Sequence, residues 1–229
     1  MFKNIIKNVH NRHPLIHCIT NYVSINDCAN IVLACGGAPI MAEDINEVSQ
    51  ITSICQGLDI NIGMLNDNKL SSMLKAGATA NELGIPVILD PVGAGSSDYR
   101  IKAVQNLMSN VQFGVIRGNV SEIKAIAAKQ GIHNIAAGVY DTMQKDKSAM
   151  GVEAGIADKI TDDNIKEMAD FINKLSQRTG AVIAVTGGID MVADENRVYA
   201  IRNGHKMMSL VTGAGCQLSA ITSAYVAAD

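Results

Sequence analysis

Short apolar runs alternate along this chain with longer stretches of helical periodicity. The clearest apolar run covers residues 85–89, and helical patterns cover residues 68–83 before it and 98–109 after it. Two parallel strands need a connection of about a dozen residues or more, and that connection is usually a helix. The alternation therefore predicts an α/β fold with a mostly parallel central sheet that helices flank on both faces.

The same patterns predict most of the other elements. The predicted strands cover residues 14–19, 38–41, 58–62, 85–89, 112–116 and 181–185. The predicted helices cover residues 23–35, 68–83, 98–109, 122–129, 161–179 and 215–227. Asp44 is expected to cap a further helix. Residues 191–193 and 197–202 predict an antiparallel hairpin at one edge of the sheet, and residues 132–159 predict a loop with one marginal helix.

Length and composition agree with this fold class. A chain of 229 residues can bury one sizeable core, so we expect a single domain over residues 1–229. Hydrophobic residues make up 48% of the chain, but aromatic residues only 3%, and tryptophan is absent. The core must therefore consist of Ile, Val, Leu, Ala and Met, which suits parallel strands that are buried on both faces.

Charge and cysteine content narrow the range of partners and compartments. The formal net charge of −3 shows no basic excess, so we expect neither nucleic acid nor an anionic membrane as a partner. No apolar run reaches the roughly 18 residues of a membrane helix, and the first twelve residues do not resemble a signal peptide. The five cysteines are odd in number and lack a C-x-x-C pair, which predicts reduced thiols and a cytoplasmic protein.

A run of small residues precedes the last predicted helix. Gly213 and Gly215 flank an alanine directly before Cys216, so the backbone amides at the start of this helix are uncovered. Such amides lie at the positive end of the helix dipole and form an anion site. An anion site with a side chain beside the reacting oxygen is typical of phosphoryl transfer. Taken alone, Cys216 is more typical of a small buried core residue.

Polar residues and glycines gather where the predicted strands end. Ligands of open α/β sheets bind outside the carboxyl ends of the strands. At or just beyond those ends lie Asn21, Met41, Gly63, Asp90, Arg117, Asn119, Glu122 and Thr186. Arg117 offers a fork for phosphate oxygens, Thr186 offers a hydroxyl, and Asp90 and Glu122 offer hard oxygens for magnesium or its waters.

Several of these residues also have a purely structural interpretation. Asp90 precedes a proline and is typical of a turn at a strand end. Asn119 is a good helix cap, and Glu122 three residues later completes a capping box. Arg117 is compatible with a surface ion pair, and Met41 with the core. The joint occurrence of all of them at one edge favours the functional interpretation.

Two common nucleotide-binding motifs are absent from the sequence. No G-x-x-x-x-G-K-[ST] is present, so the chain is not a P-loop NTPase. No G-x-G-x-x-G follows the first predicted strand, which disfavours a Rossmann dinucleotide site.

The ordered set of motifs resembles the hydroxyethylthiazole kinase family, which acts in thiamine salvage and belongs to the ribokinase-like superfamily. The resemblance runs from Pro14 to the C-terminus. Its carriers are Cys18-Ile19-Thr20-Asn21, Ala38-Pro39-Ile40-Met41-Ala42, Asn61-Ile62-Gly63, Leu89-Asp90-Pro91-Val92-Gly93-Ala94, Ile116-Arg117-Gly118-Asn119 with Glu122, Val185-Thr186-Gly187 with Asp190, and Asn203-Gly204-His205 leading into Thr212-Gly213-Ala214-Gly215-Cys216. Most ribokinase-like kinases have an aspartate where this chain has Cys216.

The resemblance implies a reaction and a role for each candidate residue. The γ-phosphoryl group of ATP would pass to the hydroxyl of 4-methyl-5-(2-hydroxyethyl)thiazole with Mg²⁺. The implied roles are phosphoryl contact for the amides of residues 213–216, ATP binding for Arg117, Thr186, Asn119 and Gly215, magnesium binding for Asp90 and Glu122, and thiazole contact for Met41, Asn21, Gly63 and Gly213. The resemblance also implies a homotrimer with sites at subunit interfaces and further helices after Asp229.

Cys216 is expected to position the hydroxyl more than to take its proton. A helix N-terminus can lower the pKa of a thiol, but a thiolate would repel a dianionic phosphate. A loose phosphoryl-transfer transition state also needs little help from a base. Two rival functions stay open at this point: another ribokinase-like enzyme, such as a pyrimidine or sugar kinase or an ATP-using hydrate dehydratase, and a non-catalytic sensor of a thiamine precursor.

Overall fold

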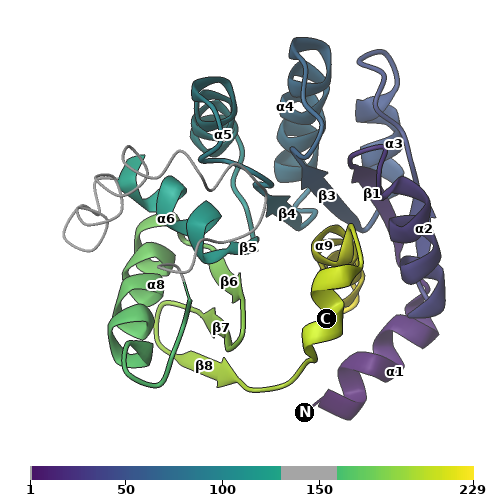
Figure 1. Cartoon of the computed structure of the whole chain (residues 1–229). Coiled ribbons are helices and arrows are strands. Elements are labelled where there is room, and N and C mark those ends of the chain that lie inside the picture. The colour runs from purple at the N-terminus through teal and green to yellow at the C-terminus, as the bar shows by residue number, and fades with distance from the viewer. Residues whose placement is uncertain (1, 130–158) are drawn as a thin grey trace. The chain divides into compact units, whose positions relative to one another are not determined.

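The computed structural model describes residues 2–129 and 159–229, which form two compact units (Figure 1). The first unit comprises residues 2–90, 107–114 and 206–229. The second unit comprises residues 91–106 and the described residues among 115–205. Helix α5 (Asp98–Asn110) contributes residues to both units.

The first unit contains four parallel strands in the order β2-β1-β3-β4. These strands are β1 (Leu15–Ile19), β2 (Ala38–Ile40), β3 (Gly57–Asn61) and β4 (Val87–Asp90). The helices are α1 (Phe2–Arg12), α2 (Ile25–Ala34), α3 (Val48–Ile54), α4 (Asp67–Glu82), the 3-10 helix η2 (Lys206–Leu210) and α9 (Ala214–Ala227). All four strands point the same way, so their carboxyl ends meet at one edge of the sheet.

Helices cover both faces of this four-stranded sheet. His17 on β1 faces α3, because its Nδ1 lies 2.9 Å from Thr52 Oγ1. Gly57 on β3 faces the other way, since a Cβ there would lie 3.2 Å from the Cβ of Ala227 on α9. Helix α9, yellow in Figure 1, packs against β1, β3 and β4. The N-terminal end of α9 thereby reaches the carboxyl edge of the strands.

The second unit contains β5 (Val115–Asn119), β6 (Val182–Thr186), β7 (Asp190–Ala193) and β8 (Val198–Ile201). Strands β5 and β6 are parallel, whereas β7 and β8 continue the order as antiparallel strands. Helix α6 (Val120–Lys129) packs on β5 and β6, and α8 (Ile165–Thr179) packs on β6 and β7. The predicted hairpin near residue 195 is confirmed as β7 and β8.

Five sequence predictions need correction or comment. The fifth strand is three residues later than predicted, and α8 begins at Ile165 rather than at residue 161. Asp44 does not cap a helix, because its carboxylate accepts from the backbone N–H of Asn46 at 2.8 Å and α3 begins only at Val48. The loop predicted over residues 132–159 lies almost entirely outside the described residues. The single domain stays a prediction.

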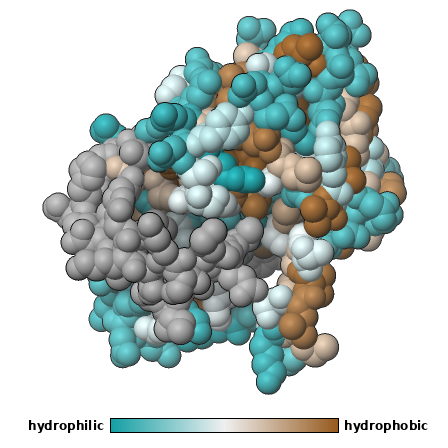
Figure 2. Space-filling model, turned by 45° about the horizontal axis from the view of Figure 1, so that its top comes forward, coloured by the Kyte–Doolittle hydropathy of each residue, from teal (hydrophilic) through white to brown (hydrophobic). Residues whose placement is uncertain are grey.

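Hydrophobic residues fill the interior of each unit. In the first unit Ile16, Leu58 and Leu89 are fully buried, and in the second unit Ile123 and Phe171 are. Hydrophilic residues cover much of the face shown in Figure 2, with smaller hydrophobic patches between them. Within the described part of the chain, no helix combines the length and the apolar character needed to cross a membrane.

Candidate functional site

A chain of polar side chains runs along the carboxyl edge of the first unit. Asn21 follows β1, while Asn61 ends β3 and Asp90 ends β4. Asn21 Nδ2 donates to Asn61 Oδ1 at 3.1 Å and to Cys216 Sγ at 3.2 Å. Asn61 Nδ2 donates in turn to Asp90 Oδ2 at 2.8 Å, and Ser219 Oγ donates to the same oxygen at 2.9 Å. Three predicted site residues, Asn21, Asp90 and Cys216, therefore belong to one buried network.

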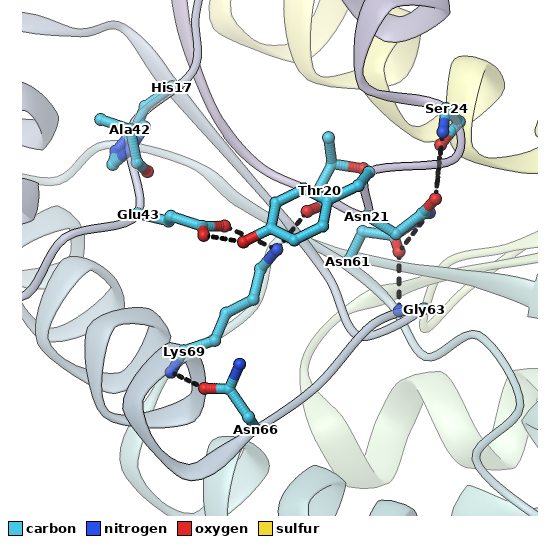
Figure 3. A network of polar contacts seen from close by, with 11 residues as sticks. His17, Thr20, Asn21, Ser24, Ala42, Glu43, Asn61, Gly63, Asn66 and Lys69 are labelled. Atoms are coloured by element: carbon cyan, nitrogen blue, oxygen red, sulfur yellow. Dashed lines mark hydrogen bonds and ion pairs between the residues drawn. The ribbon is translucent and has the colours of Figure 1, made fainter.

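Gly63 allows the two asparagines of this network to meet the backbone closely. Its N–H donates to Asn61 Oδ1 at 2.9 Å. A Cβ at this position would lie 2.9 Å from both Asn21 Nδ2 and Asn61 Oδ1 (Figure 3). Real Cβ atoms essentially never approach so closely, so a side chain here would displace one of the amides. The structure places Gly63 against Asn21 and Asn61, and its contact with the thiazole stays a prediction.

Helix α9 begins at this edge with uncovered amides. Gly213 is its N-cap, in the left-handed conformation with φ of +75°, and no side chain of the described residues caps the helix. The first amides of a helix have no partner within the helix. Those of residues 214–216 lie at the end of α9 from which the Cys216 side chain meets Asn21. A Cβ on Gly213 would lie 2.7 Å from the Cβ of Ser24, so this turn requires glycine.

Burial controls the protonation of Cys216. It raises the pKa of the Cys216 thiol, and the nearby charge of Asp90 raises it further. Hydrogen bonds with Ser24, Asn21 and Asn61 lower it only in part. The expectation that the helix N-terminus can lower this pKa is therefore outweighed. Cys216 is a neutral thiol at physiological pH.

The raised pKa predicts how Cys216 reacts with iodoacetamide. Only the thiolate is alkylated. We expect slower alkylation at pH 7.5 than for an exposed cysteine, with a rate that rises about ten-fold per pH unit to above pH 9. Peptide mass spectrometry separates Cys216 from the other four thiols, all of which are free. A rate that levels off below pH 8 would mean that Cys216 is an activated thiolate.

Lys69 forms a second polar cluster beside this network (Figure 3). Its ammonium donates to the carbonyl of Thr20 and pairs with Glu43 at 2.7 Å. It also lies 4.6 Å from the ring centroid of Tyr22, whose hydroxyl donates to Glu43. The cluster lies next to predicted site residues, because Asn21 separates Thr20 from Tyr22. Met41 lies two residues before Glu43 and is partly buried.

In the second unit, the structure brings Arg117 and Thr186 together. They lie on the adjacent strands β5 and β6, and Arg117 Nη2 donates to Thr186 Oγ1 at 2.8 Å. Arg117 is only 7% exposed, which makes a surface ion pair a poor description of it. A buried guanidinium beside a hydroxyl at the end of two strands suits a phosphate group.

Asn119 and Glu122 form the capping box that the sequence left open as an alternative. Asn119 Oδ1 accepts from the N–H of Glu122 at 2.9 Å, and Glu122 Oε2 accepts from the N–H of Asn119 at 2.8 Å. Glu122 Oε1 accepts from the N–H of Gly93, also at 2.8 Å. This arrangement holds the start of α6 against the loop after β4. A role of Glu122 in magnesium binding stays a prediction.

The donor set of the first unit is compatible with magnesium. No group of three or more His, Cys, Asp or Glu side chains among the described residues could hold a metal by itself. Mg²⁺, however, is usually held by one or two carboxylates together with water and substrate phosphates. The buried carboxylate of Asp90 is an oxygen donor of this kind, and its role as a metal ligand stays a prediction.

Several members of these clusters are not among the residues that the sequence predicts for the site. Asn61 belongs to one of the family-like motifs, but only the structure shows that it bridges Asn21 and Asp90. Ser219 lies three residues after Cys216, a spacing that places both on one face of α9 and is the available signal. Lys69 and Glu43 carry no local signal, because their pairing joins the start of α4 to the loop after β2.

Comparison with known proteins decides the family. The model of the hydroxyethylthiazole kinase family matches residues 6–229. A hydroxyethylthiazole kinase of Clostridium acetobutylicum is 52% identical over all 229 residues, which cover 78% of that protein. The chain belongs to the hydroxyethylthiazole kinase family.

Solved structures support the same family and fold. The hydroxyethylthiazole kinase protein of Pyrococcus horikoshii OT3 superimposes with a TM-score of 0.81 at 33% identity, over 98% of this chain and 75% of that one. A ribokinase-like superfamily protein of Enterococcus faecalis V583 has a TM-score of 0.59 at 10% identity, over 97% of this chain and 73% of that one. The predicted ribokinase-like fold, with its mostly parallel sheet, is thereby confirmed.

Membership also establishes the activity. Enzymes of this family transfer a phosphoryl group from ATP to the hydroxyl of 4-methyl-5-(2-hydroxyethyl)thiazole in thiamine salvage, and this chain shares that activity. The predicted family and the predicted transfer from ATP to the thiazole alcohol are confirmed, whereas the use of Mg²⁺ stays a prediction.

Proposed function

We propose that the thiazole alcohol binds and reacts at the carboxyl edge of the first unit, with its hydroxyl beside Cys216. The observation that carries this proposal is the approach of Asn21 Nδ2 to Cys216 Sγ at 3.2 Å, in front of the uncovered amides that begin α9. One small area thus holds a hydrogen-bonding group for the alcohol and donors for the transferred phosphoryl group.

The alcohol pocket is formed by Asn21, Met41, Gly63 and Gly213. Both glycines allow close packing at this edge, since a Cβ at Gly63 would meet the side chains of Asn21 and Asn61 and a Cβ at Gly213 would meet that of Ser24. Met41 offers a polarizable apolar surface for a sulfur heterocycle. Specificity for the alcohol then comes from the shape of the pocket together with the asparagine amide.

Cys216 positions the hydroxyl without acting as the base. Its raised pKa keeps the sulfur protonated, and Asp90 nearby disfavours a second negative charge. A neutral thiol can accept the hydrogen bond of the alcohol while the amides of residues 214–216 stabilise the charge on the transferring group. Because the transition state is loose, orientation supplies more of the rate than proton removal does.

Asp90 is the proposed ligand for Mg²⁺, which would neutralise charge on the phosphate oxygens when bound. In the second unit, Arg117 and Thr186 are proposed to bind ATP phosphates, with Asn119 nearby on β5. In the first unit, Gly215 at the start of α9 is proposed to contact phosphate through its backbone amide. Glu122 is a further proposed magnesium contact through water. It also caps the start of α6.

The likeness to the family also suggests an oligomeric state and a cellular location. We propose a cytoplasmic homotrimer with sites at subunit interfaces. Tyr22, Val23 and Met64, which adjoin the site residues Asn21 and Gly63, have exposed side chains that such an interface would cover. Light scattering with in-line chromatography tests the assembly: a mass near three times 24.2 kDa supports the trimer, and a monomer overturns it.

The experiment that tests the proposed function is magnesium-dependent ADP release with three alcohols. Hydroxyethylthiazole, hydroxymethylpyrimidine and a sugar alcohol are compared at equal concentration. We expect release with the thiazole alone and none without magnesium. Equal release with another alcohol would contradict the specificity of the pocket, and thiazole binding without ADP release would favour a sensor.

A further inference from the structure

Lys69 occupies a position that local rules disfavour. It is the third residue of α4, where the helix dipole favours anions rather than cations. Its side chain is only 3% exposed, whereas lysine is almost never fully buried unless it is paired. A cation in this position costs stability. We therefore expect the contacts of Lys69 with other segments to offset that cost.

The contacts of Lys69 use all three ammonium directions. One proton is donated to the carbonyl of Thr20, and a second lies toward Glu43 Oε2 at 2.7 Å. The third direction is closed by the face of Tyr22, with the nitrogen 4.6 Å from the ring centroid. Because these contacts occupy its nitrogen, Lys69 holds neighbouring groups in place and does not donate a proton to substrate.

Charge reinforces the cluster. Burial alone raises the pKa of Glu43, but hydrogen bonds from Lys69 and Tyr22 and the charge of Lys69 outweigh it, so the pKa lies below its ordinary value. The hydrogen bond to Glu43 and its negative charge raise the pKa of Tyr22. At neutral pH Glu43 is therefore a carboxylate and Tyr22 a neutral phenol.

Lys69 joins the three loops that carry the proposed alcohol pocket. The Thr20 carbonyl belongs to the peptide unit that leads directly into Asn21. Glu43 lies two residues after Met41, and the loop containing Gly63 ends at Asn66, whose side chain caps the N–H of Lys69 at 2.9 Å. Figure 3 shows the ammonium pointing away from α4 toward Thr20 and Glu43.

We propose that Lys69 is a positioning residue for the alcohol site, which fixes the Thr20–Asn21 peptide and so aims the Asn21 amide at Cys216. This inference rests on the proposed function of the first unit. Asn21 Oδ1 also accepts from the N–H and the hydroxyl of Ser24, both at 3.1 Å, so the side chain keeps contacts of its own. Without Lys69 the Thr20 carbonyl loses this partner, and the Asn21 side chain projects from a less fixed backbone. The alcohol then binds less tightly, whereas ATP binding is not affected.

The test compares Lys69→Met with Lys69→Arg and with Lys75→Met. Lys75 is a matched control, because it lies on the same helix and also donates to the loop after β2, at the carbonyl of Ile45, but from an exposed position. For Lys69→Met we expect the KM for the thiazole alcohol to rise about ten-fold, while the KM for ATP stays within about two-fold. Lys69→Arg should raise the KM for the alcohol less than Lys69→Met does. Lys75→Met should leave both KM values close to those of the wild type.

A second readout does not depend on turnover. Cys216 loses its fixed neighbour in Lys69→Met, so we expect faster alkylation by iodoacetamide than in the wild type and in Lys75→Met. Adding Glu43→Gln to Lys69→Met leaves the KM raised if the Thr20 contact matters. Recovery of the wild-type KM in that double variant would overturn the proposal, because Lys69 would then only neutralise Glu43.

Other outcomes separate this proposal from the proposed function. An equal rise in both KM values, or an unchanged rate of Cys216 alkylation in Lys69→Met, would reduce Lys69 to a general structural role and overturn the positioning proposal. A wild-type enzyme in which the thiazole alcohol gives Cys216 no protection from alkylation would instead overturn the proposed site itself.

Discussion

Replacing Gly213 by alanine should cost about 100-fold in kcat with the thiazole alcohol, because the amides that begin α9 can no longer hold their geometry. The left-handed conformation at φ +75° costs about 1–2 kcal/mol for a residue with a Cβ. The new Cβ would also lie 2.7 Å from Ser24 Cβ. Steady-state kinetics and thermal unfolding measure the two effects.

Gly84→Ala is the matched control for Gly213→Ala. Gly84 has φ of +68°, but no other group lies within 4 Å of the place that an added Cβ would take. Its replacement carries the conformational cost without the clash, so we expect a lower unfolding temperature with unchanged kcat. If Gly213→Ala behaved like Gly84→Ala, the close approach to Ser24 would have no catalytic meaning.

Asp90→Asn should lower kcat about 1,000-fold while leaving the protein as stable as before or more so. The lost activity reflects the lost magnesium ligand, since metal-ion stabilisation of a transition state supplies several kcal/mol. The amide oxygen can still accept from Asn61 and Ser219, and the substitution removes a buried charge, which favours the folded state. Kinetics over a range of magnesium concentrations, together with thermal unfolding, test both parts.

Ser219→Ala distinguishes the contribution of the hydrogen-bond network from that of the proposed metal ligand. It removes one hydrogen bond to the Asp90 carboxylate and leaves the charge in place. We expect a loss of stability of about 1 kcal/mol and less than about a ten-fold loss in kcat. Asp90→Asn with near-normal kcat at every magnesium concentration would remove Asp90 from the proposed metal site.

Much of the fold could be predicted because its signals are local. The buried runs and helical patterns predict β1, β3, β4 and α4 to within two residues at each boundary, and Asn66 is one of the residues whose type suits the start of α4. The apolar pattern places β5 too early, since Arg117 and Asn119 interrupt it. The strand nevertheless continues through these polar residues, which are the phosphate-site candidates at its carboxyl end.

The candidate site could be predicted only in part, for a related reason. Glycines and polar residues at strand ends indicate Asn21, Gly63 and Asp90 without any tertiary information. The Lys69–Glu43 pair and the contact of Ser219 with Asp90 join residues from separate elements, so no sequence window contains them. The pKa of Cys216 also depends on burial and on Asp90, and for that reason the helix N-terminus alone gives the wrong direction.

The most direct test of the central claim is the protection of Cys216 from alkylation by the thiazole alcohol. Wild-type enzyme is treated with iodoacetamide at pH 8.5, with and without hydroxyethylthiazole, and the modified peptides are quantified by mass spectrometry. We expect the alcohol to slow alkylation of Cys216 in a saturable manner and to leave Cys35, which is partly exposed, unchanged. Equal alkylation of Cys216 at saturating alcohol would show that the substrate binds elsewhere.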